Sequence, residues 1–255
     1  LRTLHRSFAW CVAVFLGFMA SSTARAVSIR KVDLVFGTSP PIFQAVSAWV
    51  AAALKRVPFV LEIRDLWPEF AVGMGVLTNP VLVRIARWLE SFLYARADLL
   101  VVNSPAYREY LLKRGIPEAK VRFVPNGVDA SMFEPAARGA ELRTEWGCDG
   151  KAVALYAGAL GPANDIPTLL SAAEILRGEP GLSFVLVGDG KDRLKLEEAA
   201  RAKGLANVRF VGTLPKRRMP EALAACDMGV AILQDIPMFR TTYPNKVFDY
   251  MAAGR

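Results

Sequence analysis

The sequence has 255 residues, 53% of them hydrophobic, and its 32 Lys and Arg outnumber its 24 Asp and Glu, which leaves a formal charge of +8. This length allows one large or two ordinary domains, and the apolar content and positive charge together indicate contact with an anionic, partly apolar surface such as a membrane. Nucleic-acid binding is disfavoured, because no basic run is interleaved with aromatic residues. The three cysteines lie far apart and form no CxxC pair, which disfavours a disulfide framework or a zinc site. A Ser-His-Asp triad would have to use His5, the single histidine.

The first 26 residues are similar to a secretory signal. Arg2 and Arg6 precede an apolar run over residues 8–20, and Ala-Arg-Ala follows at 24–26. As a helix this run is about 20 Å long, shorter than the roughly 30 Å hydrocarbon core of a bilayer. It is therefore no spanning helix by itself, and we favour an apolar helix on a domain core or membrane surface over a cleaved signal.

Short apolar runs alternate with helical patterns along the rest of the chain. The runs that predict strands, with the turns after them, are at 32–41, 59–69, 98–106, 121–127, 153–161, 184–190, 208–212 and 228–233. The helical patterns are at 42–55, 80–95, 105–114, 165–177, 191–203, 218–225 and 245–253. Runs rich in Val, Leu, Ile and Phe fit strands buried on both faces, and their alternation with helices predicts an α/β fold with parallel sheets.

These units form two series, separated by residues 125–150, which contain no strand-like run. We predict two facing Rossmann-like domains, a first at 1–128 that includes the apolar helix 8–20 and a second at 129–255. Each series has about four strands, whereas complete sheets of this kind have roughly five to seven. Both domains are therefore expected to be partial.

Ligands in open parallel sheets bind beyond the carboxyl ends of the strands, so the turns after the strands are the places to search. Gly158-Ala159-Leu160-Gly161 follows a strand and precedes a helix near Asp165. Two glycines let the backbone approach a ligand, and the amides at a helix N-terminus favour an anion such as a diphosphate. The alternative is a plain strand-to-helix turn, and the spacing matches neither GxGxxG nor a P-loop.

Two further turns are candidates for the same ligand. Gly188-Asp189-Gly190 ends the next strand, with an Asp-capped turn as the alternative. Gly212 and Thr213 end the third strand, where free backbone groups could meet the edge of a base.

The last helical stretch carries Lys246, Asp249 and Tyr250 on one face, because they occupy positions i, i+3 and i+4 of a helix. Val247, Phe248 and Met251 are expected to give the apolar face toward the sheet. A lysine there can meet a phosphate, and a carboxylate can accept two sugar hydroxyls. The alternative is a surface Lys–Asp pair.

In the first domain a polar cluster leaves the strand at 59–63. Glu62, Asp65 and Glu69 are its carboxylates and Arg64 its cation. The structural alternative is an Arg–Asp pair that braces the loop.

Taken together and in this order, the segments resemble the family 4 glycosyltransferases of the GT-B fold, and among them the bacterial sugar transferases of surface-polysaccharide and O-antigen synthesis, the WbuB-like group. The segments that carry the resemblance are VDLVFGTSPP, FVLEIRDLWPE, DLLVVNSPAYREYLLKRGIP, VRFVPNGVD, YAGALG, DIPTLLSAAEIL, FVLVGDG, VRFVGTLP and YPNKVFDYMAAGR. They cover residues 30–255.

The resemblance implies a retaining transferase without metal or other cofactor. A nucleotide-sugar donor, expected to be UDP-linked, would bind mainly the second domain, and a lipid-linked saccharide acceptor the first. The departing diphosphate would help to take the acceptor proton while protein groups stabilise its charge. The protein would then lie in the cytoplasm, peripheral at the inner membrane.

Site residues follow from the matching positions. The expected donor-binding residues are Gly158, Leu160, Gly161, Gly188, Asp189, Gly212, Thr213, Lys246 and Asp249. The expected catalytic residues are Arg64, Asp65 and Lys246, and those on the acceptor side are Ser39 and Glu69.

The sequence departs from the family at four positions. Thr241 replaces the first of two glutamates eight apart, of which Asp249 matches the second. The family's diphosphate-clamping Arg and Lys fall near Ala159 and Asn164. A family histidine falls on Arg64, which stays charged at pH 7 and cannot act as a base.

The family pattern also extends beyond both ends of the sequence, so we expect a fragment. Lost clamp residues leave open a non-catalytic GT-B protein that binds a membrane or partner. A nucleotide-sugar 2-epimerase shares the fold, but depends on histidines and acidic groups in the cleft that this sequence lacks.

Overall fold

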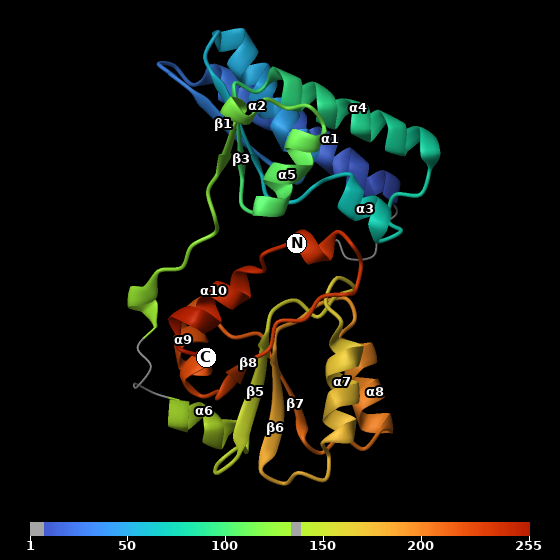
Figure 1. The fold of residues 1–255 in the computed structure, drawn as a ribbon, viewed down its shortest axis with the longest axis vertical. Helices are drawn as coiled ribbons and strands as arrows, with labels where there is room; N and C mark the ends of the chain where they lie inside the picture. Colours follow the sequence, from blue (N-terminus) through green and yellow to red (C-terminus); the bar gives the residue numbers. More distant parts are fainter. Residues whose placement is uncertain (1–7, 134–138) are drawn as a thin grey trace. The chain divides into compact units, whose positions relative to one another are not determined.

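A computed structural model of the chain describes residues 8–133 and 139–255. It has two compact units (Figure 1), which we call unit 1, residues 1–125 and 236–243, and unit 2, residues 126–235 and 244–255. Each unit contains a four-stranded sheet in which all neighbouring strands are parallel. The prediction of an α/β fold with two parallel sheets of four strands is confirmed.

Unit 1 has the strand order β1-β2-β3-β4. Its strands are β1 (Val35–Ser39), β2 (Phe59–Ile63), β3 (Leu99–Val102) and β4 (Val121–Phe123). Its helices are α1 (Phe8–Ser28), α2 (Ile42–Lys55), α3 (Glu69–Gly73), α4 (Pro80–Arg96) and α5 (Pro105–Lys113), with the 3-10 turns η1 (Glu118–Lys120) and η4 (Phe239–Thr241). The side chains of Asn79 and Ser104 cap α4 and α5, and a proline follows each cap, a combination that favours the start of a helix.

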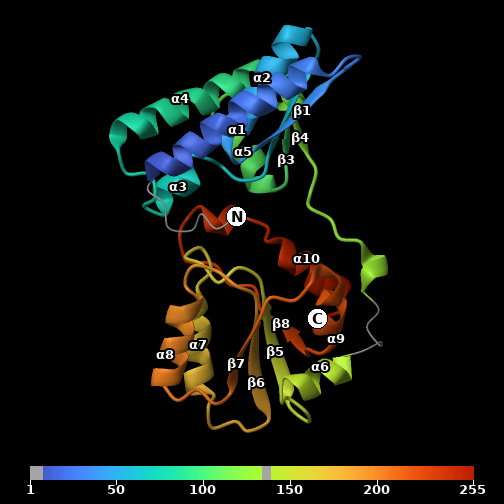
Figure 2. The ribbon, with the colours of Figure 1, turned by 180° about the vertical axis from the view of Figure 1, so that it is seen from behind.

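The apolar N-terminal segment forms a helix that packs on unit 1. Helix α1 continues to Ser28, beyond the predicted end at residue 20. It lies along α2 (Figure 2), where the Ser47 hydroxyl donates to the Met19 carbonyl at 3.1 Å and the Lys55 ammonium donates to the Val27 carbonyl at 2.9 Å. None of the described helices combines the length and the apolarity needed to cross a membrane.

Unit 2 has the strand order β7-β6-β5-β8. Its strands are β5 (Ala152–Ala157), β6 (Leu182–Val187), β7 (Val208–Gly212) and β8 (Met228–Gly229). Its helices are α6 (Gly139–Glu145), α7 (Ile166–Ile175), α8 (Arg193–Ala202), α9 (Met219–Ala224) and α10 (Asn245–Ala252), with the 3-10 turns η2 (Ala130–Met132) and η3 (Lys216–Arg218).

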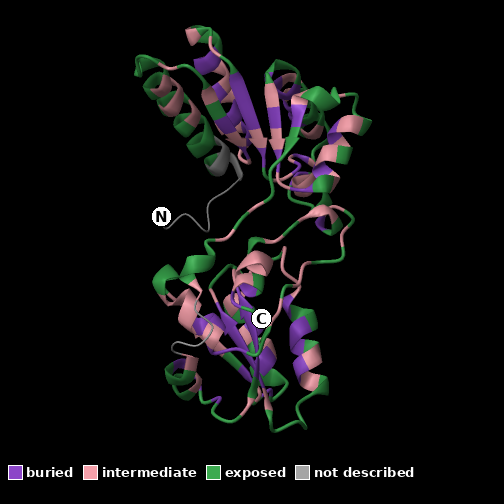
Figure 3. Cartoon of the chain, turned by 60° about the vertical axis from the view of Figure 1, so that its left-hand side comes forward, coloured by how far each residue is buried: buried purple, intermediate pink, exposed green. Residues whose placement is uncertain are grey.

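The sheet of unit 2 is covered on both faces. Helices α7 and α8 lie on one face and α6, α9 and α10 on the other (Figures 1 and 2). Side chains of β5 alternate between the two layers: Val153 and Leu155 pack toward α6, α9 and α10, and Ala154 and Tyr156 toward α7 and α8. Strands β5 and β6 are accordingly buried along nearly their whole length (Figure 3), as the apolar runs predicted.

Two details of the last strand and helix differ from the prediction. Strand β8 ends at Gly229 instead of residue 233, and a side chain at Gly229 would start 2.4 Å from the Tyr250 ring. Tyr250, 4% exposed, is the α10 residue that packs on the sheet, whereas Met251 is 69% exposed. The Tyr250 hydroxyl accepts from the Ala157 amide at 3.0 Å and donates to the Val230 carbonyl at 3.2 Å, so it replaces ladder bonds that a longer strand would make.

The segment between β8 and α10 belongs to unit 1 over residues 236–243. The Phe239 ring lies 5.4 Å from the Phe70 ring, and the Ser104 hydroxyl donates to the Thr241 carbonyl at 2.6 Å. Thr241 and Asp249, which the resemblance matches to a pair of glutamates, are thus parts of different units.

Candidate functional site

A cavity of about 390 Å³ opens in unit 2 at the carboxyl ends of β5 and β6, which is where ligands bind in sheets of this type. The turn after β7 and helices α9 and α10 complete its walls. Its lining residues are Ala157, Gly158, Ala159, Val187, Gly188, Asp189, Thr213, Leu214, Met219, Leu223, Lys246, Asp249 and Tyr250.

The turns that form the floor of the cavity are bonded to one another through their backbones. The Gly158 amide donates to the Val187 carbonyl at 2.9 Å, and the Leu160 amide donates to the Asp189 carbonyl at 2.9 Å. The approach requires glycine, since a Cβ at Gly188 would lie 1.8 Å from the Gly158 carbonyl oxygen. The floor is therefore a fixed backbone surface that a ligand can approach closely.

Lys246 projects from the first turn of α10 into this cavity. Its ammonium lies 3.9 Å from the centre of the Tyr156 ring and 3.4 Å from the Asn164 side-chain oxygen. Among the described residues no carboxylate forms an ion pair with it, and burial lowers the pKa of Lys246 to about 8. In its protonated form this ammonium can pair with an anionic ligand.

Asp249 lines the same cavity one helical turn later. Burial raises the pKa of its carboxyl above the ordinary value of 3.8, and Lys216 acts in the opposite direction. The cavity thus places an ammonium and a carboxylate along one wall, opposite backbone turns. This arrangement can hold a group with a negative end and a hydroxylated end.

Six of the nine predicted donor-binding residues line the cavity: Gly158, Gly188, Asp189, Thr213, Lys246 and Asp249. Leu160, Gly161 and Gly212 do not. The Leu160 side chain is fully buried in the layer under α7 and α8, and the Gly212 carbonyl accepts from the Gly188 amide at 2.7 Å. Leu160 and Gly212 therefore help to build the floor through their backbones.

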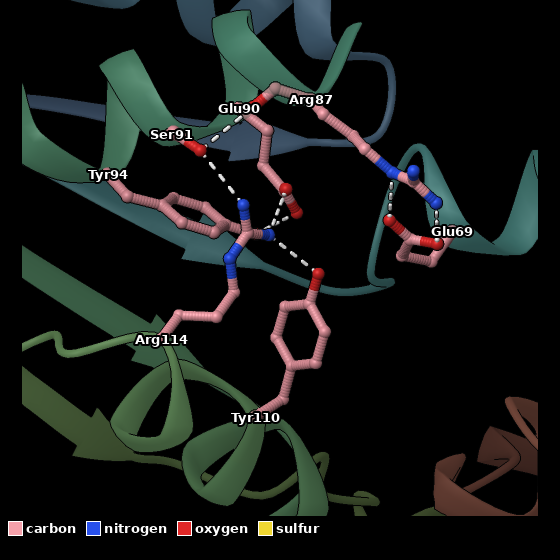
Figure 4. A network of polar contacts seen from close by, with 7 residues as sticks. All are labelled: Glu69, Arg87, Glu90, Ser91, Tyr94, Tyr110 and Arg114. Carbon is pink, nitrogen blue, oxygen red and sulfur yellow. Dashed lines mark hydrogen bonds and ion pairs between the residues drawn. The ribbon is translucent and has the colours of Figure 1, made fainter. Parts of the chain in front are cut away.

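The predicted residues of unit 1 divide into two groups. Ser39, Arg64 and Asp65 lie together at the carboxyl edge of the sheet, where the Arg64 amide donates to the Ser39 carbonyl at 2.9 Å. Burial raises the pKa of Asp65, with Arg64 opposing the shift. Glu69 instead makes a two-bond ion pair with Arg87 of α4, at 2.7 and 3.0 Å (Figure 4).

Tyr156, Met219 and Leu223 were not among the predicted site residues, and Asn164 was predicted only as the position of a lost clamp residue. Tyr156 is fully buried, and its hydroxyl donates to the Ala159 carbonyl at 2.7 Å. One signal was available: Tyr156 is the only residue with a polar group in the run AVALYA, and it stands two residues before Gly158. Among the described residues no group of three His, Cys, Asp or Glu side chains is placed to hold a metal ion.

Comparison with known families identifies both halves of the chain. Residues 3–127 match the family described as "Glycosyl transferase 4-like domain", and residues 151–255 match "Glycosyl transferases group 1". The chain is 31% identical to "Probable glycosyltransferase WbjE" of Pseudomonas aeruginosa, an alignment that covers all of this chain and 62% of WbjE. It is 30% identical to "GDP-mannose-dependent alpha-mannosyltransferase" of Mycobacterium tuberculosis, over 90% of this chain and 57% of the relative.

Solved structures share the fold. The Anabaena protein Alr3699/HepE in complex with UDP and glucose superposes with a TM-score of 0.74 at 21% identity, over 94% of this chain and 61% of HepE. Sucrose-phosphate synthase from Thermosynechococcus elongatus gives 0.71 at 19% identity, over 100% of this chain and 62% of the synthase. The chain thus spans about 60% of the length of these proteins. The matched families, the curated relatives and the two parallel α/β sheets agree, and the chain belongs to the family 4 glycosyltransferases of the GT-B fold.

Proposed function

We propose that the protein transfers a sugar, with retention of anomeric configuration, from a nucleotide-sugar donor to a lipid-linked saccharide in polysaccharide synthesis at the inner membrane. The observation that carries this proposal is the cavity of unit 2, where Lys246 and Asp249 of α10 face the glycine turns after β5 and β6. A donor diphosphate fits beside the ammonium and the turns, and ribose hydroxyls fit the carboxylate.

The chemistry needs no side-chain base in unit 2. The bond from the anomeric carbon to the diphosphate oxygen breaks, and its electron pair stays on the diphosphate. The acceptor oxygen bonds to the anomeric carbon on the same face, and its proton passes to the departing diphosphate. Lys246 and the turn amides stabilise the negative charge that grows on that group.

The nucleotide is expected to be UDP, and guanosine donors are the alternative to test. HepE is named in complex with UDP and glucose, whereas the mycobacterial relative is named as GDP-mannose-dependent. Isothermal titration calorimetry of the chain with UDP, GDP and their sugar conjugates decides between them. Absence of binding by every one of these ligands would contradict the proposed donor site.

Unit 1 supports a lipid-linked acceptor and peripheral membrane contact. A second cavity, of about 470 Å³, lies among α1, α2, α3 and α4, and every residue that lines it is apolar. They are Phe15, Ile42, Phe43, Trp67, Ala71, Val76, Leu77, Leu82, Ile85, Ala86 and Leu89. Around it α1 and α4 expose Trp10, Phe18, Ile85 and Trp88, side chains that prefer a membrane interface to water.

A transfer assay tests the whole proposal. The complete gene product is incubated with radiolabelled nucleotide sugars and a bacterial membrane lipid extract, and label in the lipid fraction is counted. Asp249→Ala removes charge-assisted hydrogen bonds worth about 1.5–3 kcal/mol each, so donor affinity should fall about 10- to 100-fold. Glu198→Ala, on the exposed side of α8, is the control and should behave as wild type.

The same assay addresses the alternative of a non-catalytic protein, which the absent clamp residues and Thr241 keep open. A protein that binds the nucleotide but labels no lipid with any donor in the panel would favour that alternative. Equal labelling by wild type and Asp249→Ala would remove Asp249 from the site.

A further inference from the structure

The ammonium of Lys246 and the ring that it contacts belong to opposite layers of unit 2. Lys246 comes from α10, which packs on the same face of the sheet as α6 and α9. Tyr156 points from β5 into the layer of α7 and α8. The lysine side chain therefore crosses the carboxyl end of β5 to reach the tyrosine.

Gly158 makes this crossing possible. A Cβ at this position would lie 2.7 Å from the Lys246 nitrogen and 3.3 Å from the Tyr156 hydroxyl, and its φ of +152° is one that other residues rarely adopt. The missing side chain thus leaves the space that Lys246 occupies.

The contacts around Lys246 form a closed ring. The ammonium lies over the Tyr156 ring at 3.9 Å and near the Asn164 oxygen at 3.4 Å. The side-chain amide of Asn164 donates to the Ala159 carbonyl at 3.0 Å, and the Tyr156 hydroxyl donates to that same carbonyl at 2.7 Å. The side chains of Tyr156 and Asn164 therefore hold the lysine and the turn after β5 together.

We propose that Tyr156 is a positioning residue for the donor diphosphate, which it serves by holding Lys246 and the Gly158–Gly161 turn in register, with Asn164 as its partner. This inference rests on the proposed function. The aromatic face attracts a cation without neutralising it, unlike a carboxylate, so the full positive charge of Lys246 stays available to an anion. The side-chain oxygen of Asn164 then helps to orient the lysine that arrives from α10.

The first test needs no ligand. In a two-dimensional carbon–proton spectrum of the chain, the Lys246 ε-methylene should be shifted upfield by the Tyr156 ring. Tyr156→Phe should keep this shift, because the ring remains, and Tyr156→Leu should abolish it. An ε-methylene at the usual position of exposed lysines in the wild type would overturn the proposal.

The second test measures affinity for UDP, GDP and inorganic pyrophosphate by calorimetry. Tyr156→Leu should weaken binding about tenfold, and Tyr156→Phe and Asn164→Ala about threefold. Phe184→Leu is the matched control, an aromatic of the same buried layer on β6, and should bind as wild type. Asn164 is only partly buried, so its variant keeps the test valid if Tyr156→Leu fails to fold.

A double-mutant cycle separates positioning from general stability. If Tyr156 acts through Lys246, then adding Tyr156→Leu to Lys246→Met should weaken binding less than twofold further. Independent effects that multiply would overturn the inference, as would an unchanged affinity of Tyr156→Leu. Failure of the wild type to bind any of the three ligands would contradict the donor site itself together with this inference.

Discussion

The two units have similar sheets, but they differ in charge and in the number of hydrophobic side chains that they expose. Unit 1 carries 17 Lys and Arg against 8 Asp and Glu, and unit 2 carries 15 against 16, so the charge of +8 comes from unit 1 alone. Of the 24 large hydrophobic side chains that the described residues expose, 18 belong to unit 1 and 6 to unit 2. The whole-chain composition therefore averaged a basic, apolar unit with a nearly neutral one.

This difference matches the two tasks of the proposed function. A basic surface with exposed apolar side chains suits an anionic membrane that presents a lipid-linked acceptor. A neutral unit whose polar groups gather around one cavity suits a dissolved nucleotide sugar. Changes in one unit should then leave the task of the other intact.

The largest effect is expected in unit 2 from Gly188→Ala. The new Cβ would lie 1.8 Å from the Gly158 carbonyl oxygen at a φ of +147°, so the joined turns must move apart. We expect a loss of about 3 kcal/mol in the free energy of unfolding of unit 2. Hydrogen exchange measured by mass spectrometry should show lost protection in peptides of unit 2, including β5, β6 and β7, and unchanged protection in unit 1.

Gly181→Ala is the matched control, because nothing lies within 4 Å of its added Cβ. Equal loss of protection in unit 1 peptides would show that the two units unfold together, and would contradict their independence.

The corresponding prediction for unit 1 concerns the buried Glu90. Its carboxylate pairs with Arg114 and accepts from the Tyr94 hydroxyl at 2.9 Å, and Arg114 also donates to the Tyr110 hydroxyl at 2.6 Å (Figure 4). Arg114→Met leaves a carboxyl that is 1% exposed without its cation. We expect the free energy of unfolding of unit 1 to fall by about 2–3 kcal/mol. The loss should be smaller than for a fully buried ion pair, because Arg114 is partly exposed.

The pH dependence of this loss follows from the pKa of Glu90, which burial raises above its ordinary 4.5 while Arg114 opposes the shift. A raised pKa in the folded state contributes stability below about pH 4.5 that is lost as the pH rises through the folded value. Without Arg114 the pKa rises further, so the variant should be less destabilised at pH 5 than at pH 8. Arg108→Met is the control, because it removes an exposed ion pair with Glu118. It should lower the free energy of unfolding by less than about 1 kcal/mol at both pH values.

The sequence predicted the sheets well because buried parallel strands are continuous apolar runs, whose signal needs no long-range information. It was wrong about α10 for the opposite reason. Met251 is the more apolar residue and was assigned to the sheet, yet Tyr250 packs there because its hydroxyl satisfies backbone groups of Ala157 and Val230. That demand exists only once β8 has ended at Gly229, and the apolar run 228–233 gave no sign of the end.

The candidate site was predictable to a similar degree. Turns after strands pointed to Gly158, Gly188 and Asp189, since topology places them at one edge. The contact between Tyr156 and Lys246 joins residues 90 positions apart across two layers of the unit, and no spacing rule describes it.

A smaller effect, on unit 1, tests membrane contact. Trp88 is 64% exposed on α4 and stacks on Phe92 at 5.6 Å. If it enters the interface, Trp88→Ser should weaken binding to vesicles of phosphatidylglycerol and phosphatidylcholine about tenfold, from about 1.5 kcal/mol of lost apolar burial. Binding should also fall between 0.05 and about 0.5 M salt as screening grows.

Ile175→Ser is the control for this experiment, because Ile175 is 83% exposed on α7 of unit 2. An equal loss from both variants would place membrane contact on both units, and UDP affinity should stay unchanged in Trp88→Ser.

The smallest effect is expected in the pH dependence of UDP binding to unit 2. This measurement distinguishes the contribution of the Lys246 charge from that of the other titratable groups around the cavity. Burial lowers the pKa of Lys246 to about 8, and only the protonated form attracts a diphosphate. The other titratable groups that line the cavity or contact the lysine are Tyr156, Tyr250, Asp189 and Asp249. Burial raises the pKa of Tyr250 to about 12 and raises that of Tyr156 further, and burial also raises the pKa of the Asp249 carboxyl above its ordinary value.

Between pH 8 and 9 the protonated fraction of Lys246 therefore falls about fivefold, and UDP affinity should fall with it, since the phosphates are already ionised. Lys246→Arg keeps its charge throughout and should give a flat profile over this range, whatever its absolute affinity. A wild-type profile that stays flat to pH 9 would mean that Lys246 does not meet the diphosphate. The backbone amides of the turns would then be the groups that attract the diphosphate. Donor binding by unit 2 would depend on its backbone geometry and not on the charge of Lys246.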